Sequence, residues 1–177
     1  VANSTVALYL DLPQAPNQKE NLIGICTGTL ITKDIVLTAA HCFVDAGKEI
    51  EMNTEELRQR TRIAFGLPVF NNENSKDSQA VQFRLAKSVI IHSKYYVGAV
   101  YKAEKEAMYD MALIQLDSAA HAGYEPVQVN ADKDLLKKGT EVILAGYGAT
   151  KGGIFPIRPK QLMKVNVHID NPQLTQT

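Results

Sequence analysis

The chain has 177 residues, of which 45% are hydrophobic, and its 19 basic and 19 acidic residues cancel to a formal net charge of zero. This composition is typical of a globular protein with a sizeable core, and the balanced charge gives no argument for a nucleic-acid partner or an anionic membrane surface. No apolar run is long enough to cross a bilayer as a helix, and no signal peptide is recognisable at the first residues.

The first third of the chain contains three short segments that are typical of β-strands, because they are rich in apolar and β-branched residues. They lie at residues 6–10, 22–31 and 35–37. The segment between the first two, residues 11–21, carries two prolines and is expected to be a loop.

The middle of the chain predicts a strand at residues 62–66 and one or two strands within residues 81–91. Between them lies a segment rich in Asn, Ser, Asp and Glu, residues 70–78, which is expected to be a surface loop. Asn53 followed three residues later by Glu56 resembles a capping box and indicates a helical turn.

The last part of the chain carries three more candidate strands: an apolar run that follows Asp110, and segments at residues 141–148 and 160–169. Residues 117–126 are expected to connect the first of these to the second. The final segment alternates with the period of a strand, and its apolar members are Met163, Val165, Val167 and Ile169. Many short strands with turn residues between them predict an all-β protein, either a barrel or a sandwich.

The strongest chemical signal lies between the two cysteines, Cys26 and Cys42. Residues 26–31 read Cys-Thr-Gly-Thr-Leu-Ile, and residues 38–42 read Thr-Ala-Ala-His-Cys. These phrases resemble the histidine motif of trypsin-like (chymotrypsin-fold) serine proteases and the cysteine phrase that precedes it. The resemblance implies that His41 is a general base, a role that histidine fills most often near neutral pH. The alternative is an ordinary histidine beside two free cysteines.

The resemblance also implies a disulfide between Cys26 and Cys42, the only cysteines in the sequence. Such a bond would tie the turn that bears His41 to the preceding strand. It favours an oxidising compartment, so we expect a secreted or periplasmic protein. Two cysteines taken alone leave open a reduced, cytosolic pair.

Residues 110–114 read Asp-Met-Ala-Leu-Ile and resemble the aspartate motif of the same family. The resemblance implies that Asp110 accepts a hydrogen bond from the His41 ring and stabilises the imidazolium that forms during acyl transfer. Taken alone, this motif would by default be interpreted as an exposed aspartate at the start of a strand. Residues 146–148, Gly-Tyr-Gly, resemble the family's later Gly-Trp-Gly motif, with tyrosine in place of tryptophan.

The nucleophile motif of the family, Gly-Asp-Ser-Gly-Gly, has no counterpart, and the last serine in the sequence is Ser118. We therefore expect an all-β, two-barrel trypsin-like fold that is only partly present. Residues 1–120 are expected to form the complete first barrel, with His41 and Asp110. Residues 121–177 are expected to form the connection and the opening strands of the second barrel. A second polypeptide segment, either a cleaved partner chain or residues outside the given sequence, is expected to complete that barrel and bring the nucleophilic serine to His41.

The sequence thus predicts a serine endopeptidase, inactive as this chain alone, that cleaves polypeptide substrates through an acyl-enzyme. Its candidate catalytic residues are His41 and Asp110. A different class of function is the runner-up: a catalytically inactive serine-protease homologue that acts as a binding module. An unrelated β-sandwich binding domain is the third hypothesis, and it requires both motifs and the cysteine phrase to be coincidences.

No cofactor and no metal are expected. Calcium-binding relatives carry an acid where Leu67 stands, just before the polar loop, and a calcium site needs about six to eight oxygen ligands. A zinc site built from Cys26, His41 and Cys42 lacks further ligands at suitable spacing. Neither nucleic acid nor a membrane is expected as a partner.

Overall fold

The computed structural model describes most of the chain, and the fold is built from the residues that it describes. These are residues 2–12, 21–43, 54–66, 81–95, 109–132, 135, 137–148 and 162–170. The predicted polar loop at residues 70–78, the position of Leu67 and the predicted cap residue Asn53 lie outside the described residues. No helix in the described part of the chain has the length and apolar character needed to span a membrane.

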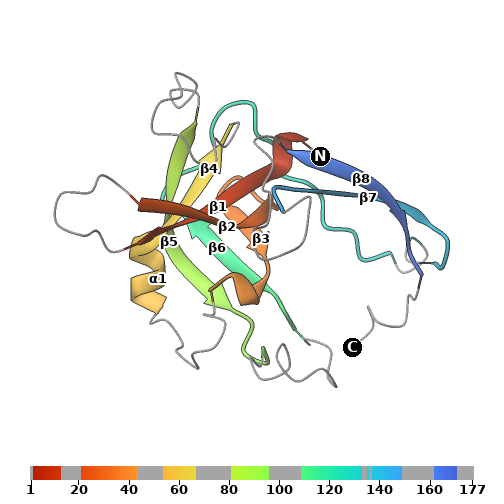
Figure 1. Cartoon of the computed structure of the whole chain (residues 1–177), viewed down its shortest axis with the longest axis horizontal. Helices are drawn as coiled ribbons and strands as arrows, with labels where there is room; N and C mark the ends of the chain where they lie inside the picture. Colours follow the sequence, from red (N-terminus) through yellow and green to blue (C-terminus); the bar gives the residue numbers. More distant parts are fainter. Residues whose placement is uncertain are drawn as a thin grey trace.

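Six antiparallel strands close into a barrel in the order β1-β2-β3-β6-β5-β4 (Figure 1). The strands are β1 (Thr5–Leu12), β2 (Asn21–Leu30), β3 (Ile35–Thr38), β4 (Thr61–Phe65), β5 (Gln82–Ile91) and β6 (Ala112–Leu116). The segment at residues 81–91 therefore forms a single strand, and the fold is all-β, as predicted. The described residues also include three short helical pieces. These are η1 (Ala2–Ser4), η2 (Ala40–Phe43) and α1 (Thr54–Arg60).

The interior of the barrel is filled by one side of each strand. On β6, for example, Ala112, Ile114 and Leu116 are buried, while Leu113 points outward and is 37% exposed. Each large apolar side chain that is fully buried in this way stabilises the fold by about 1.5–3 kcal/mol. The apolar run that predicts β6 thus divides between core and surface only in the structure. The core cluster comprises Val6, Leu8, Leu30, Val36, Phe43, Leu57, Ile63, Phe65, Ala86, Val89, Ala112, Ile114 and Leu116.

Strand β2 approaches β3 so closely that one position requires glycine. A Cβ atom placed on Gly28 would lie 2.4 Å from the Cγ1 atom of Val36 and 3.2 Å from the Cγ2 atom of Val6. Both valines are fully buried and cannot move aside without disturbing the core. The Gly in the Cys-Thr-Gly-Thr phrase is therefore explained by packing inside the barrel.

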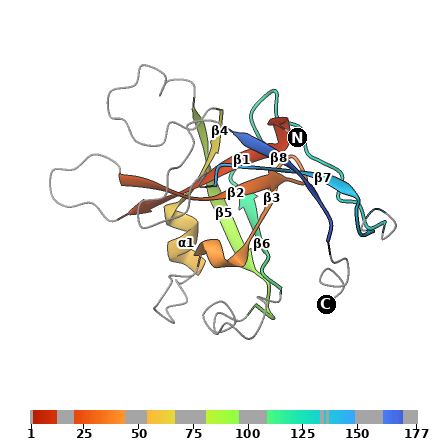
Figure 2. The ribbon, with the colours of Figure 1, turned by 45° about the vertical axis from the view of Figure 1, so that its right-hand side comes forward.

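Helix α1 lies against β5 beside one end of the barrel (Figures 1 and 2). Its central residue, Leu57, is fully buried in the core cluster. On its exposed side Glu56 pairs with Arg60 one turn later, a spacing that places two side chains next to each other on a helix. The predicted helical turn is present, and one apolar anchor attaches it to the barrel.

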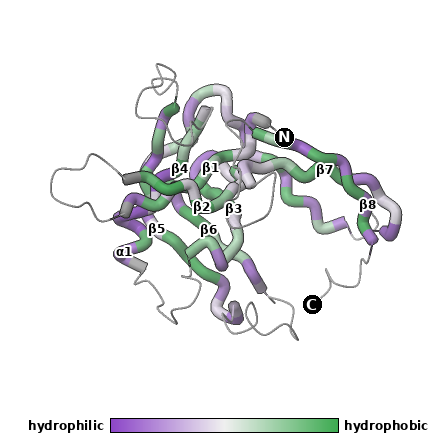
Figure 3. Tube along the Cα trace, viewed as in Figure 1, coloured by the Kyte–Doolittle hydropathy of each residue, from purple (hydrophilic) through white to green (hydrophobic). Residues whose placement is uncertain are grey.

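A separate two-stranded antiparallel sheet follows the barrel, formed by β7 (Glu141–Gly146) and β8 (Met163–His168). Leu144 pairs with Val165, and Val142 pairs with Val167, so these four side chains share one face of the sheet. Leu144 is 56% exposed and Val165 is 55% exposed. Figure 3 shows the hydrophobic residues of β7 and β8 in green, away from the barrel core. The described residues leave this apolar face uncovered.

The second sheet is joined to the barrel where β7 ends. The backbone N–H of Tyr147 donates a hydrogen bond of 2.8 Å to the Thr27 hydroxyl on β2. The Tyr147 ring is buried against Ala7, Tyr9 and Ala64. Burial, with a smaller contribution from Tyr124, raises the pKa of Tyr147 to about 12. The Gly-Tyr-Gly phrase thus forms the contact between the two sheets.

Candidate active site

His41 lies on the short helical turn η2, directly after β3. The first and last residues of this turn, Ala40 and Phe43, are buried, whereas the His41 side chain is 55% exposed. The small and apolar neighbours hold the turn against the barrel, and the imidazole projects from it. A ring presented in this way is rigidly mounted and accessible, as a general base must be.

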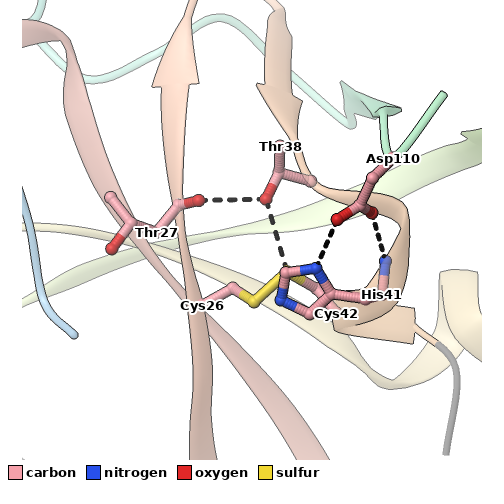
Figure 4. Close-up of polar contacts among 6 residues, drawn as sticks. All are labelled: Cys26, Thr27, Thr38, His41, Cys42 and Asp110. Atoms are coloured by element: carbon pink, nitrogen blue, oxygen red, sulfur yellow. Dashed lines mark hydrogen bonds and ion pairs between the residues drawn. A yellow bond between two sulfur atoms is a disulfide. The ribbon is translucent and has the colours of Figure 1, made fainter. Parts of the chain in front are cut away.

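A disulfide joins Cys26 on β2 to Cys42 on η2, with their Cα atoms 6.0 Å apart. Beside it, the Thr38 hydroxyl donates to the carbonyl oxygen of Thr27 at 2.9 Å and lies 3.8 Å from the Cys42 sulfur (Figure 4). The disulfide therefore connects the His41 turn to β2, and the Thr38 hydrogen bond connects the preceding end of β3 to the same strand. The pairing that the family resemblance implies is the one in the structure.

Asp110 holds His41 through both of its carboxylate oxygens. Its Oδ1 accepts the backbone N–H of His41 at 2.8 Å, and its Oδ2 lies 2.7 Å from the ring atom Nδ1 (Figure 4). An ionised carboxylate can only accept hydrogen bonds, so Nδ1 carries the proton in this arrangement. In a neutral imidazole with its proton on Nδ1, the other ring nitrogen, Nε2, is free to accept a proton from a reacting group.

The topology explains how two residues 69 positions apart meet. Strand β3 pairs with β6, and Thr38 at the end of β3 lies opposite Ala112 at the start of β6. His41 follows Thr38 by three residues, and Asp110 precedes Ala112 by two. The strand register thus brings the two polar residues to the same end of the barrel.

A cluster of possible metal ligands in the described part of the chain is Cys26, His41 and Cys42, whose ligand atoms lie within 4.8 Å of one another. The two sulfurs are bonded to each other and offer no thiolate. The Nδ1 atom of His41 is hydrogen-bonded to the Asp110 carboxylate. This cluster therefore lacks the donor set of a zinc site.

The ring of His41 has one hydrogen-bond partner in the described part of the chain, and that partner is Asp110. No serine among the described residues is hydrogen-bonded to it.

Three residues near Asp110 are absent from the sequence-based candidates: His92, Lys94 and Tyr109. The motif that reveals Asp110 contains none of them, and only the structure places their side chains together.

The family model described as Trypsin matches residues 14–177 of the chain. The match spans most of the barrel and the whole of the second sheet. No curated protein matches the chain. The division into domains at residues 1–120 and 121–177 stays a prediction.

Proposed function

Because the chain belongs to the trypsin family, and is thus a hydrolase of the serine-protease type, we propose that it carries the general base of a serine endopeptidase. In this proposal His41 is the base and Asp110 is the acid that orients it. The observation that carries it is the pair of hydrogen bonds that the Asp110 carboxylate accepts from the backbone N–H and the ring of the same histidine.

The chemistry follows the acyl-enzyme mechanism of the family. The Nε2 atom of His41 takes the proton of a serine hydroxyl as its oxygen attacks a peptide carbonyl, and later gives that proton to the leaving amine. Asp110 stabilises the imidazolium formed in between, because its carboxylate already accepts the Nδ1 proton. The backbone bond to Oδ1 keeps the carboxylate from rotating as the charge on the ring changes.

The nucleophile is proposed to come from a second polypeptide segment that completes the second barrel. The support is the apolar face of β7 and β8 that the described residues leave uncovered, where Leu144 and Val165 are paired and more than half exposed. An isolated pair of strands is marginally stable in water, and each large side chain left exposed forgoes about 1.5–3 kcal/mol. Further strands on this face would remove that cost and would carry the serine, since no serine follows Ser118 in the sequence.

The substrate is proposed to be a polypeptide, and the compartment to be extracellular or periplasmic. The Cys26–Cys42 disulfide supports the second part, because such bonds persist in oxidising environments. Neither a cofactor nor a metal enters the proposed reaction, whose proton transfers need only His41, Asp110 and the serine.

A second candidate function is a catalytically inactive homologue that binds proteins. It is favoured by one observation: no serine hydroxyl among the described residues is bonded to the His41 ring. The two candidates differ in whether a serine reactive enough to attack an electrophile is present in the purified protein.

A fluorophosphonate probe, which bonds covalently to an activated serine, tests the proposal directly. We expect the wild-type protein to be labelled and to hydrolyse a peptide substrate, and His41→Ala to lose both properties. Mass spectrometry should locate the label on a serine outside residues 1–177. A wild-type protein that is neither labelled nor active would contradict the proposal and favour the binding homologue.

A further inference from the structure

The backbone before Asp110 is held in an unfavourable conformation. Tyr109 has a φ angle of 58°, and among the residues that the structure describes it is the one non-glycine residue with a positive φ. The N–H of Met111 donates to the carbonyl oxygen of Tyr109 at 2.7 Å, which makes Asp110 the centre of a three-residue turn. A bulky residue keeps a left-handed conformation only where its surroundings hold it there.

The contact that holds Tyr109 is a stack with the ring of His92. The two ring centroids lie 4.8 Å apart and the ring planes are 9° from parallel. The ammonium group of Lys94 lies 5.3 Å from the centroid of the Tyr109 ring, within cation–π distance. Both contacts stabilise the position of the ring, and neither survives if Tyr109 rotates into an ordinary backbone conformation.

His92 is in turn fixed by the barrel. Its N–H donates to the carbonyl oxygen of Met111 at 3.0 Å, which continues the β5–β6 pairing one residue beyond Ile91 and Ala112. Its Nδ1 atom accepts the N–H of Lys94 at 3.2 Å, which sets the plane of the ring. The strand register thus determines where the His92 ring lies, independently of Tyr109.

We propose that the stacked rings of His92 and Tyr109 position Asp110, and through Asp110 position His41. The barrel places His92, His92 holds Tyr109 in the left-handed conformation, and the next residue along the chain is the acid that contacts His41. Neither ring touches His41 or the reacting atoms, so both are positioning residues. The inference rests on the proposed function, in which Asp110 orients the general base.

Four substitutions distinguish the contribution of the Tyr109 ring from that of its left-handed backbone conformation. Tyr109→Phe keeps the stack, Tyr109→Ala removes the ring but keeps the Cβ that disfavours a positive φ, and Tyr109→Gly removes both. His92→Ala removes the partner ring. His121→Ala is the matched control, because His121 is another partly buried histidine packed against an aromatic ring, Phe65, beyond the opposite end of β6.

The first measurement follows the two hydrogen bonds themselves by NMR in the purified wild-type protein and its variants. It records hydrogen exchange of the His41 backbone N–H and the resonance of the proton on its Nδ1. In Tyr109→Ala and His92→Ala we expect the His41 backbone N–H to exchange about tenfold to a hundredfold faster, because the strain of one left-handed residue corresponds to a change of that size. We also expect the resonance of the Nδ1 proton to shift. Tyr109→Phe should retain both signals, Tyr109→Gly should fall between, and His121→Ala should match wild type.

The second measurement is peptide hydrolysis by the same proteins. We expect kcat lower by about tenfold to a hundredfold in Tyr109→Ala and His92→Ala with KM unchanged, because misplacing Asp110 affects the chemical step and not substrate binding. If the NMR signals change as expected in a protein without peptidase activity, the proposed function fails and the positioning role stands. Wild-type exchange at His41 in both Tyr109→Ala and His92→Ala would overturn the positioning role, whether or not the protein is active.

Discussion

Thr38 and Ala112 lie directly opposite each other across β3 and β6, and this pair determines that His41 and Asp110 meet. Both polar residues lie just beyond the paired strands, one after β3 and one before β6. A slip of the register by one residue would turn every side chain of the strand to the other face. The geometry of the candidate site is therefore tied to the packing of the barrel core.

Asp110→Asn is expected to lower turnover by about 10⁴-fold, the loss typical of this change in a Ser-His-Asp triad. An amide presents its NH₂ group to Nδ1 of His41 and favours the wrong ring tautomer, while the fold is retained. Steady-state hydrolysis measures the effect. Asp117→Asn, which changes an exposed acid beyond the opposite end of β6, serves as the control, and equal loss in both variants would contradict the role of Asp110.

Removal of the disulfide is expected to lower the free energy of unfolding by about 3 kcal/mol, as the chain-entropy model gives for a loop of this length. The two cysteines are 16 positions apart in the sequence. Denaturant unfolding of Cys26→Ala, Cys42→Ala and the double variant measures it. Each single variant should lose about as much as the double one, because either change breaks the same bond. A double variant as stable as wild type would show that the bond contributes nothing.

Gly28→Ala is expected to destabilise the barrel by about 1–3 kcal/mol, the usual cost of overpacking a core. The added methyl group would lie 2.4 Å from the Cγ1 atom of Val36. Gly148→Ala is the control, since no atom lies within 4 Å of a Cβ placed there. Unfolding curves should show that Val36→Ala added to Gly28→Ala costs less than the sum of the two single changes. Strict additivity would mean that the two sites do not share a packing conflict.

Leu144→Asp is expected to prevent the proposed second segment from binding, because it places a charge on the apolar face that this segment would cover. Ile143→Asp provides a matched control. Ile143 is 50% exposed, close to the 56% of Leu144, but it pairs with Asn166 on the opposite face of the sheet. Native mass spectrometry should find the second component with Ile143→Asp and not with Leu144→Asp. Retention of that component by both variants would mean that it does not occupy this face.

Stability is expected to decline between about pH 10 and pH 12 partly because of Tyr147. Its pKa is raised in the folded protein from 10.0 to about 12, mainly by burial. The folded state therefore holds the phenol proton more tightly than the unfolded chain. The resulting stabilisation is complete below pH 10 and is lost as the pH rises through the folded value. Tyr147→Phe should show a shallower decline over this range in pH-dependent unfolding, and an unchanged slope would contradict the assignment.

Local patterns in the sequence were enough to locate most strands and both residues of the candidate site, His41 and Asp110. The apolar run that contains Ile114 and the β-branched run near Val36 indicate strands, because that signal depends only on residues that are neighbours in the sequence. His41 and Asp110 are found in the same way, since each lies within a short motif. The family match then confirms the class of protein that those motifs indicate.

The relations between distant residues were decided only by the tertiary structure. Nothing near Asp110 in the sequence shows that both of its oxygens bond to His41, that Tyr109 adopts a left-handed conformation, or that the His92 ring stacks on it. These contacts depend on which strands pair and in which register, and that is settled by closing the whole barrel around its core. The exposure of Leu144 has the same origin: an alternating pattern shows that a strand has an apolar face, but only the packing of other elements shows whether that face is covered.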